Sequence, residues 1–222
     1  MLLVFSAILS IMLILLVPLS PILASSTSSE NNNLQKTTTK ATTISQEQSN
    51  NLTPYSNPTH GIKFQYPSDW KLVEHGDNDY HNLNIVAEFL QPNQNNYYNQ
   101  NISASHNSLR ISVENYSAFA DTQNNNNPGN QLQNIGNHRL GAIGISCPGF
   151  DLRSYIRNAT LAGSPAYEIN FDYSYLNNNK KAIEIWTVKD NKVYIIDYVA
   201  YEQVYDITVP IVQNMIASFE IT

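Results

Sequence analysis

Residues 151–200 decide the fold of this chain, and they read DLRSYIRNAT LAGSPAYEIN FDYSYLNNNK KAIEIWTVKD NKVYIIDYVA. Side chains in residues 165–175 alternate between aromatic or aliphatic and polar, a period of two that is typical of a strand with one buried face. The next two runs, residues 182–189 and 192–200, are rich in β-branched and aromatic residues, which favour strands. The stretch therefore predicts four antiparallel strands that follow one another as a continuous meander.

Short connections set the predicted register of this meander. The Asp-Asn dipeptide at residues 190–191 tolerates positive φ and suits a two-residue hairpin turn, so Glu184 should lie opposite Asp197. We expect residues 176–180 to form a loop, which places Asp172 beside Glu184. A slip of one residue would move every side chain to the other face, so the agreement of the apolar pattern supports this register.

The same register predicts a row of carboxylates on three adjacent strands, formed by Asp172, Glu184 and Asp197. Like charges directly opposite each other destabilise a strand pair, so a neighbouring group should offset them. Arg153 and Arg157, on the preceding strand, would produce an ordinary surface charge network. The alternatives are a basic group of a partner protein and a bound metal such as Ca²⁺, which prefers oxygen ligands.

A second candidate metal site lies in the segment EHGDNDYH at residues 74–81. His75, Asp77, Asp79 and His81 occupy alternate positions, so on an extended chain they would point the same way. Imidazole together with carboxylate is a ligand set that suits a transition metal. The Gly-Asp-Asn sequence inside the segment also favours an ordinary turn, and the spacing matches no strict zinc motif.

The first 54 residues are predicted to lie outside the folded domain. Residues 1–24 are almost continuously apolar and carry no charge, which is typical of a secretory signal peptide. No Lys or Arg precedes the apolar run, and its length also suits an uncleaved membrane anchor. Residues 25–54 are rich in Ser, Thr, Asn and Gln and predict a disordered stalk. We therefore expect export, with the domain at the cell surface or outside the cell.

The rest of the folded domain, residues 55–222, should add strands, loops and two helices. Strands are expected at residues 61–66, 83–90, 109–116 and 218–221. Two Asn-rich insertions are interpreted as surface loops, at residues 91–107 and 121–131. A weak helix is predicted at residues 131–145, where three glycines lower the helix propensity. A second helix, capped by Thr208 with Pro210 in its first turn, should cover the apolar face of the meander.

Composition and motifs exclude several classes of function. The chain has 222 residues and a formal net charge of −6, and it contains no basic cluster, which argues against nucleic acid binding. Cys147 is the only cysteine, so no intrachain disulfide can form. A Pro-Gly turn follows it, and no neighbouring His or helix N-terminus would activate its thiol. Gly-x-Ser-x-Gly, His-Glu-x-x-His and phosphate-binding motifs are missing from the sequence, so we expect no catalytic activity.

Four Asn-x-Ser/Thr sequons occur, at Asn51, Asn101, Asn115 and Asn158. In an exported protein, Asn51 in the stalk and Asn101 in a loop are candidate glycosylation sites. Asn158 is expected within a strand on the apolar face, which argues against a glycan there. Chance occurrence in an Asn-rich chain is the alternative explanation.

Four segments resemble the PsbP-like domain family. They are GIKFQYPSDW at residues 61–70, LAGSPAY at 161–167, VYIIDY at 193–198, and residues 211–221, which end in SFEI. The resemblance covers residues 55–222 and implies an α+β fold, an antiparallel β-sheet flanked by helices on both faces in an α/β/α sandwich. It also implies a domain without catalytic activity. The Asn-rich composition and the predicted export of this chain resemble the archaeal members of the family rather than the photosynthetic members. In the photosynthetic members, the domain is an extrinsic subunit docked on a membrane complex.

These features together predict a secreted or membrane-tethered interaction module, an accessory subunit of a cell-surface or membrane protein complex. The alternative is an extracellular protein that binds a metal or a small ligand through the carboxylate row or the His75 segment. A hydrolase is a more distant alternative.

Overall fold

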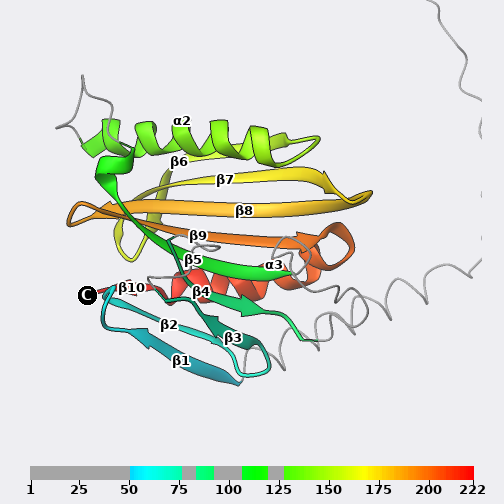
Figure 1. Ribbon diagram of the computed structural model, residues 1–222. Helices are drawn as coiled ribbons and strands as arrows, with labels where there is room; N and C mark the ends of the chain where they lie inside the picture. The colour runs from blue at the N-terminus through cyan, green and yellow to red at the C-terminus, as the bar shows by residue number, and fades with distance from the viewer. Residues whose placement is uncertain (1–50, 77–83, 93–106, 120–127) are drawn as a thin grey trace, which may run out of the picture.

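The computed structural model describes residues 51–76, 84–92, 107–119 and 128–222 (Figure 1). Within these ranges the chain forms ten strands, two α-helices and one short 3₁₀ helix. The strands are β1 (Leu52–Asn57), β2 (Ile62–Pro67), β3 (Lys71–Glu74), β4 (Ile85–Leu90), β5 (Ser108–Asn115), β6 (Asp151–Leu161), β7 (Ser164–Tyr175), β8 (Asn178–Lys189), β9 (Lys192–Tyr201) and β10 (Glu220–Ile221). The helices are η2 (Tyr116–Ala118), α2 (Pro128–Ser146) and α3 (Glu202–Ala217).

The strands form two antiparallel sheets. The larger has seven strands in the order β3-β4-β5-β9-β8-β7-β6, and the smaller has three in the order β1-β2-β10. Consecutive strands β6, β7, β8 and β9 lie side by side, so the predicted four-stranded meander is confirmed. The coarse prediction of a mostly antiparallel sheet combined with helices is confirmed as well.

The predicted register between β8 and β9 is confirmed. Asp190 and Asn191 form the two-residue turn with φ angles of 51° and 61°. Glu184 lies opposite Asp197, as the turn predicts. The Asp-Asn sequence was informative here because both residue types tolerate positive φ.

The predicted register between β7 and β8 is wrong. The connection is a two-residue turn at Leu176 and Asn177, with φ angles of 48° and 62°, rather than a five-residue loop. Strand β8 therefore starts at Asn178 and is shifted by three residues from the prediction. An odd shift exchanges the two faces of the sheet, so Asp172 lies opposite Lys181 instead of Glu184.

Strand β6, at one edge of the larger sheet, contains two irregularities. Ala162 and Gly163, with φ angles of 51° and 73°, form the tight turn that joins β6 to β7. Register shifts between Ile156 and Ala159, and again between Leu152 and Ser154, then displace the strand relative to β7. The two strands therefore keep the register set by the turn only as far as Ala159, because each bulge adds an unpaired residue to β6.

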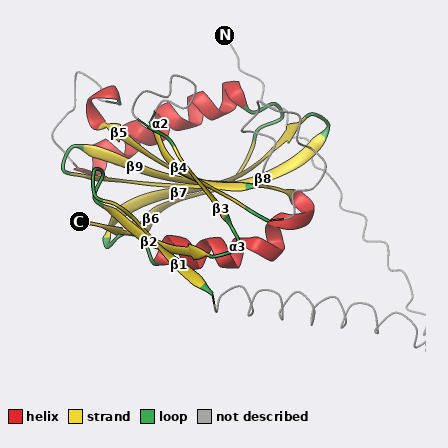
Figure 2. Cartoon of the chain, turned by 60° about the horizontal axis from the view of Figure 1, so that its bottom comes forward, coloured by secondary structure: helices red, strands yellow, loops and turns green. Residues whose placement is uncertain are grey.

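Alternate residues of the meander contact different helices. Trp186 and Ile195 belong to a buried cluster that includes Leu132 and Ile135 of α2; we call this set of contacts the α2 side. Ile185 and Ile196 belong to a cluster that includes Ile211, Val212 and Met215 of α3; we call this set the α3 side. Figure 2 shows both helices alongside the strands of the larger sheet. Each strand therefore contributes side chains to two hydrophobic cores, because successive side chains point in opposite directions.

Helix α3 begins earlier than predicted. Its first residue is Glu202, with Tyr201 as N-cap, and Pro210 lies inside the helix rather than in the first turn. Thr208 is not a cap: its hydroxyl is buried, bonds the Tyr198 hydroxyl and donates to the Val204 carbonyl oxygen. A helical Thr commonly bonds the carbonyl four residues earlier, so its presence did not mark the start of the helix.

Strands β1 and β3 were not predicted, whereas β2, β4, β5 and β10 lie near their predicted positions. Helix α2 extends beyond the predicted residues 131–145 at both ends, and so takes in residues 128–131 of the second expected loop. The rest of the two Asn-rich loops falls mainly outside the described residues. Strand β1 starts at Leu52, three residues before the predicted start of the domain at residue 55.

Candidate docking groove beside helix α3

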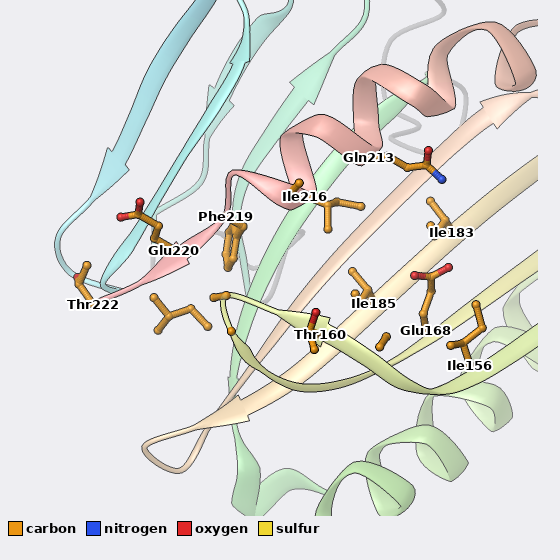
Figure 3. A pocket seen from close by; sticks show the side chains of 15 residues that line it. Ile156, Thr160, Glu168, Ile183, Ile185, Gln213, Ile216, Phe219, Glu220 and Thr222 are labelled. Atoms are coloured by element: carbon orange, nitrogen blue, oxygen red, sulfur yellow. The ribbon is translucent and has the colours of Figure 1, made fainter.

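A groove with a cavity volume of about 780 Å³ lies on the α3 side (Figure 3). We call it the α3 groove. Its floor comes from strands β6, β7 and β8, through Ile156, Glu168, Ile183 and Ile185. One wall is the last part of α3 and the chain that follows it, with Gln213, Ile216, Phe219 and Thr222. A volume of this size lies within the range of about 300–1,000 Å³ that is usual for ligand sites.

The groove exists because α3 covers only part of the sheet. The helix has its most extensive strand contacts with β9, whereas β6 and β7 extend the same sheet to its edge. Ile156 of edge strand β6 lines the groove and remains 37% exposed. The groove is therefore an apolar strip of the sheet that the chain's own helix leaves uncovered.

The C-terminal wall of the groove is held by several hydrogen bonds. The Thr222 amide donates to the Gly61 carbonyl oxygen at 2.8 Å, and Lys189 Nζ donates to the Ile221 carbonyl oxygen at 2.6 Å. Gly61 has a φ of +66°, and a Cβ there would meet the Thr222 carbonyl oxygen at 2.6 Å, so this contact requires glycine. The wall is thus fixed before any ligand arrives.

One carboxylate, Glu168, lies in the apolar floor. It pairs with Ile156 on one neighbouring strand and Ile185 on the other, and Figure 3 shows it between them. Asn170 Nδ2 donates to Glu168 Oε1 at 3.0 Å. Burial, followed by the negative charge of Glu168, raises the pKa of nearby Tyr205 to about 12, so this phenol stays protonated at neutral pH.

The α2 side carries a different set of charges. Glu184 and Asp197 are neighbours, as predicted, and each is bound by an arginine that the sequence did not single out. Arg139 of α2 forms a bidentate pair with Glu184, with Nε–Oε1 and Nη2–Oε2 distances of 2.8 and 2.7 Å. Arg110 of β5 donates from Nε to Asp197 Oδ1 at 3.0 Å. These two arginines offset the repulsion between the adjacent carboxylates.

The pKa values of both guanidinium groups are consistent with this pairing. The negative charge of Asp197 is the largest influence on Arg110 and raises its pKa. For Arg139, burial alone would lower the pKa, but the charge of Glu184 and its hydrogen bonds raise it overall. The Glu184 side chain is only 4% exposed, so its pair with Arg139 is largely removed from water. The cluster therefore joins α2 to the sheet through charge-assisted bonds.

The predicted row of three carboxylates does not form. Asp172 lies on the α3 side of the sheet, because the Leu176-Asn177 turn shifts β8 by three residues. Arg153 Nη2 binds Asp172 Oδ2 at 2.7 Å, and Arg153 Nη1 binds Asp151 Oδ2 at 3.0 Å. Of the two arginines expected to offset the carboxylates, Arg153 binds Asp172, whereas Arg157 lies over the Tyr155 ring, with its Cζ 4.9 Å from the ring centroid. Among the described residues, no group of three His, Cys, Asp or Glu side chains is placed to hold a metal ion.

The second candidate metal site cannot be assembled from the described residues. His75 follows β3 and is described, whereas Asp77, Asp79 and His81 lie outside the described residues. Their use as transition metal ligands stays a prediction.

Cys147 follows α2 and is half-buried. Burial is the main cause that raises the pKa of its thiol, so the neutral form is favoured at pH 7. The predicted turn after it is present, because the Phe150 amide donates to the Cys147 carbonyl oxygen at 3.1 Å.

The sequence did not indicate that Lys180 is buried. The loop predicted at residues 176–180 includes Lys180, yet this residue lies in β8 with 0% exposure. Its Nζ lies 3.4 Å from the centroid of the Tyr201 ring, a cation–π contact. Burial lowers the pKa of this amine to about 8. The position of Lys180 depends on the two-residue turn before it, which the sequence did not reveal.

Three of the four sequons lie within the described residues. Asn51 is exposed just before β1, whereas Asn115 caps η2 by accepting from the Ser117 amide at 3.1 Å. Asn158 is exposed in the irregular part of β6, so its expected position on the apolar face was wrong. Asn101 lies outside the described residues.

An antiparallel sheet combined with two helices defines the class as an α+β domain. The chain belongs to the PsbP-like protein family, whose sequence profile matches residues 7–221. No curated protein matches the sequence.

Two solved structures have a similar fold. One is the solution structure of cyanobacterial PsbP (CyanoP) from Synechocystis sp. PCC 6803, with a TM-score of 0.54 and 13% identity, over 78% of this chain and 93% of that chain. The other is LpqN of Mycobacterium tuberculosis, described as involved in cell envelope biogenesis, with a TM-score of 0.50 and 16% identity, over 77% of this chain and 90% of that chain. At these identities the similarity shows the fold alone.

None of the helices in the described ranges combines the length and the apolar character that a membrane span requires.

Proposed function

We propose that this protein is an accessory module that binds a partner protein through the α3 groove and catalyses no reaction itself. The observation that carries the proposal is a preformed groove of about 780 Å³ with a mainly aliphatic floor, a fixed wall and an exposed isoleucine on that floor. Membership of the PsbP-like family supports an accessory role. Contiguous apolar surface of this kind is typical of binding sites.

The chemistry of the described residues supports a role without catalysis. The thiol of Cys147 is kept protonated by burial, which disfavours a nucleophilic role. Glu184 and Asp197 form ion pairs with arginines on the α2 side, so these two carboxylates are poor candidates for a general acid and base. Glu168 is the carboxylate in the groove floor, and Asn170 fixes its orientation.

We further infer that the domain acts at the cell surface or outside the cell, secreted or tethered by residues 1–24. The apolar, uncharged composition of this segment supports export. The exposed Asn51 supports glycosylation at that site in an exported chain. The contacts of α2 with Trp186 and of α3 with the adjacent Ile185 support an α/β/α sandwich, with a helix on each face of the sheet.

Site-specific photo-crosslinking in living cells of the native host tests the proposed function. The full-length chain would carry p-benzoylphenylalanine at Ile156 in the groove or, as the matched control, at Ile145, an isoleucine of α2 that is 88% exposed. We expect one defined protein adduct, identified by mass spectrometry, from position 156 and none from position 145. If both positions give the same adducts, or position 156 gives none, the proposed function is wrong.

A further inference from the structure

We propose that the occupant of the α3 groove is an extended apolar peptide segment of the partner protein that places a Lys or Arg side chain against Glu168. This inference rests on the proposed function and adds to it the chemistry of the partner.

The charged residues of the groove all have the same sign. Glu168 lies in the floor and Glu220 at the end formed by the C-terminal segment, and no Lys or Arg lines the groove. Within the described part of the chain, Glu168 forms no ion pair, and its oriented hydrogen bond comes from the neutral amide of Asn170. An apolar ligand that covered this carboxylate without a cation would desolvate it at a high cost in free energy. A basic side chain in the ligand removes that cost and adds a charge-assisted hydrogen bond.

The apolar floor selects the rest of the ligand. Ile156 of β6 and Ile183 and Ile185 of β8 lie on the two strands beside β7 and flank Glu168 (Figure 3). Ile156 is the exposed member, so a bound ligand would remove its side chain from water. Burial of apolar surface contributes roughly 25 cal/mol per Å². Aliphatic side chains on both sides of the basic residue therefore match the floor.

Polar groups on the groove walls favour a peptide over an acyl chain. Gln213 supplies an amide that both donates and accepts, and Thr160 supplies a hydroxyl. The backbone amides of a peptide can satisfy these groups, whereas a hydrocarbon chain would leave them without partners at a cost of about 1–3 kcal/mol each. Membrane lipids also carry phosphate, which the two glutamates of the groove would repel.

The shape of strand β6 favours a peptide that binds through the peptide's side chains over a peptide that pairs with β6 as an additional strand of the sheet. β6 is the edge of the sheet, but its two bulges interrupt the regular series of outward backbone groups. Bulges of this kind prevent a further strand from pairing along the edge. The ligand therefore lies over the face of β6, β7 and β8, beside α3.

A fluorescence anisotropy titration with the full-length protein tests the inference. The probes are the fluorescein-labelled peptides GSVLKVLSG, GSVLEVLSG and GSVLLVLSG, which differ only in the central residue. We expect the Lys peptide to bind at least about tenfold more tightly than the Glu peptide, which corresponds to about 1.4 kcal/mol. This preference should weaken as the salt concentration rises.

Two variants of Glu168 and one control make the test specific. Glu168→Gln should abolish the preference for the Lys peptide, and Glu168→Lys should invert it. Glu202→Gln, an exposed glutamate in the first turn of α3 and outside the groove, should leave the preference unchanged. Circular dichroism of each variant establishes that the fold is retained.

Three results would overturn the inference. They are equal affinity for the Lys and Glu peptides, a Lys preference that survives in Glu168→Gln, and tight binding of the fluorescent fatty acid cis-parinarate with no binding of any peptide. If these results occur while crosslinking at position 156 still gives one defined adduct, the proposed function stands and only the chemistry of the partner is wrong. A missing adduct together with a clear Lys preference would contradict the proposed function and, with it, the assignment of the ligand to a partner protein; only the preference of the groove for a basic peptide would remain.

Discussion

The same strands build two unlike regions, the α2 side and the α3 side. On the α2 side, Glu184 and Asp197 are charged, but arginines bind both and a helix covers the area. On the α3 side the floor is mainly aliphatic, yet part of it stays open as the α3 groove. The comparison teaches that carboxylates paired with arginines under a helix mark a structural joint on this sheet, and that the uncovered aliphatic floor around Glu168 marks the candidate site.

The largest expected effect comes from a residue that joins α2 to the sheet. Trp186 has 0% exposure, and its indole N–H donates to the Leu132 carbonyl oxygen at 3.2 Å. Trp186→Ala should lower the free energy of unfolding by about 3–5 kcal/mol, because it leaves a large cavity. Urea denaturation measures the change. A loss below about 1 kcal/mol would show that the α2 side is not a structural joint.

A smaller effect is expected from the ion pair between Glu184 and Arg139. Glu184→Gln should lower the free energy of unfolding by about 2–3 kcal/mol, because a neutral amide cannot accept two bonds from the guanidinium. The matched control is Glu168→Gln on the α3 side, which should cost less than about 0.5 kcal/mol. Thermal and urea unfolding of both variants compare the two sides. Equal losses would contradict the distinction between them.

Lys180 adds a pH-dependent contribution on the α2 side. Burial lowers its pKa in the folded state to about 8, below the ordinary value for a lysine. The unfolded chain therefore binds the proton more tightly, so stability due to this group rises as the pH increases from about 8 to about 10.5. At pH 7, Lys180→Met should be about 1–2 kcal/mol more stable than the natural chain. Urea denaturation at several pH values should show this advantage shrinking above pH 8, and a constant advantage would contradict the prediction.

The smallest effect on stability is expected in the groove. Ile156→Thr retains a β-branched side chain at a position that is 37% exposed, so it should change the free energy of unfolding by about 0.5 kcal/mol or less. The same variant should weaken binding of the GSVLKVLSG peptide several-fold, because it removes apolar surface from the floor. If this variant instead lost much stability and bound the peptide unchanged, the α3 groove would be a structural region and not the binding site.

The sequence predicts the centre of the fold well because its turn residues are informative. Asp190 and Asn191 set the register of β8 and β9, and the strict alternation in β7 identifies a strand with two different faces. The alternation persists over many residues, so local chemistry is sufficient there.

The errors arise where backbone geometry is not evident from residue type. Leucine rarely adopts positive φ, so Leu176 did not indicate the two-residue turn that it forms. Because of that one turn, Asp172 lies on the α3 side and Lys180 lies in β8, and the sequence predicted neither position. The bulges of β6 were likewise hidden, because no glycine or proline marks them.

The α3 groove could not be predicted because it combines segments that are far apart in the sequence. Ile156, Glu168 and Ile185 belong to the meander, whereas Gln213 and Phe219 belong to the C-terminal part. Their proximity depends on where α3 ends on the sheet and on the bond between Gly61 and Thr222. A single sequence contains no pattern that specifies those distances.

The two irregularities of β6 also bear on how the protein behaves at high concentration. A straight, regular edge of this length would act as a template on which another copy could continue the sheet. Removing the extra residue from each irregularity, Arg153 from one and Asn158 from the other, would straighten the edge and expose an unbroken series of backbone donors and acceptors. In such a variant, two copies could pair through their β6 edges and continue the sheet from one copy into the next, so we expect it to associate at high concentration.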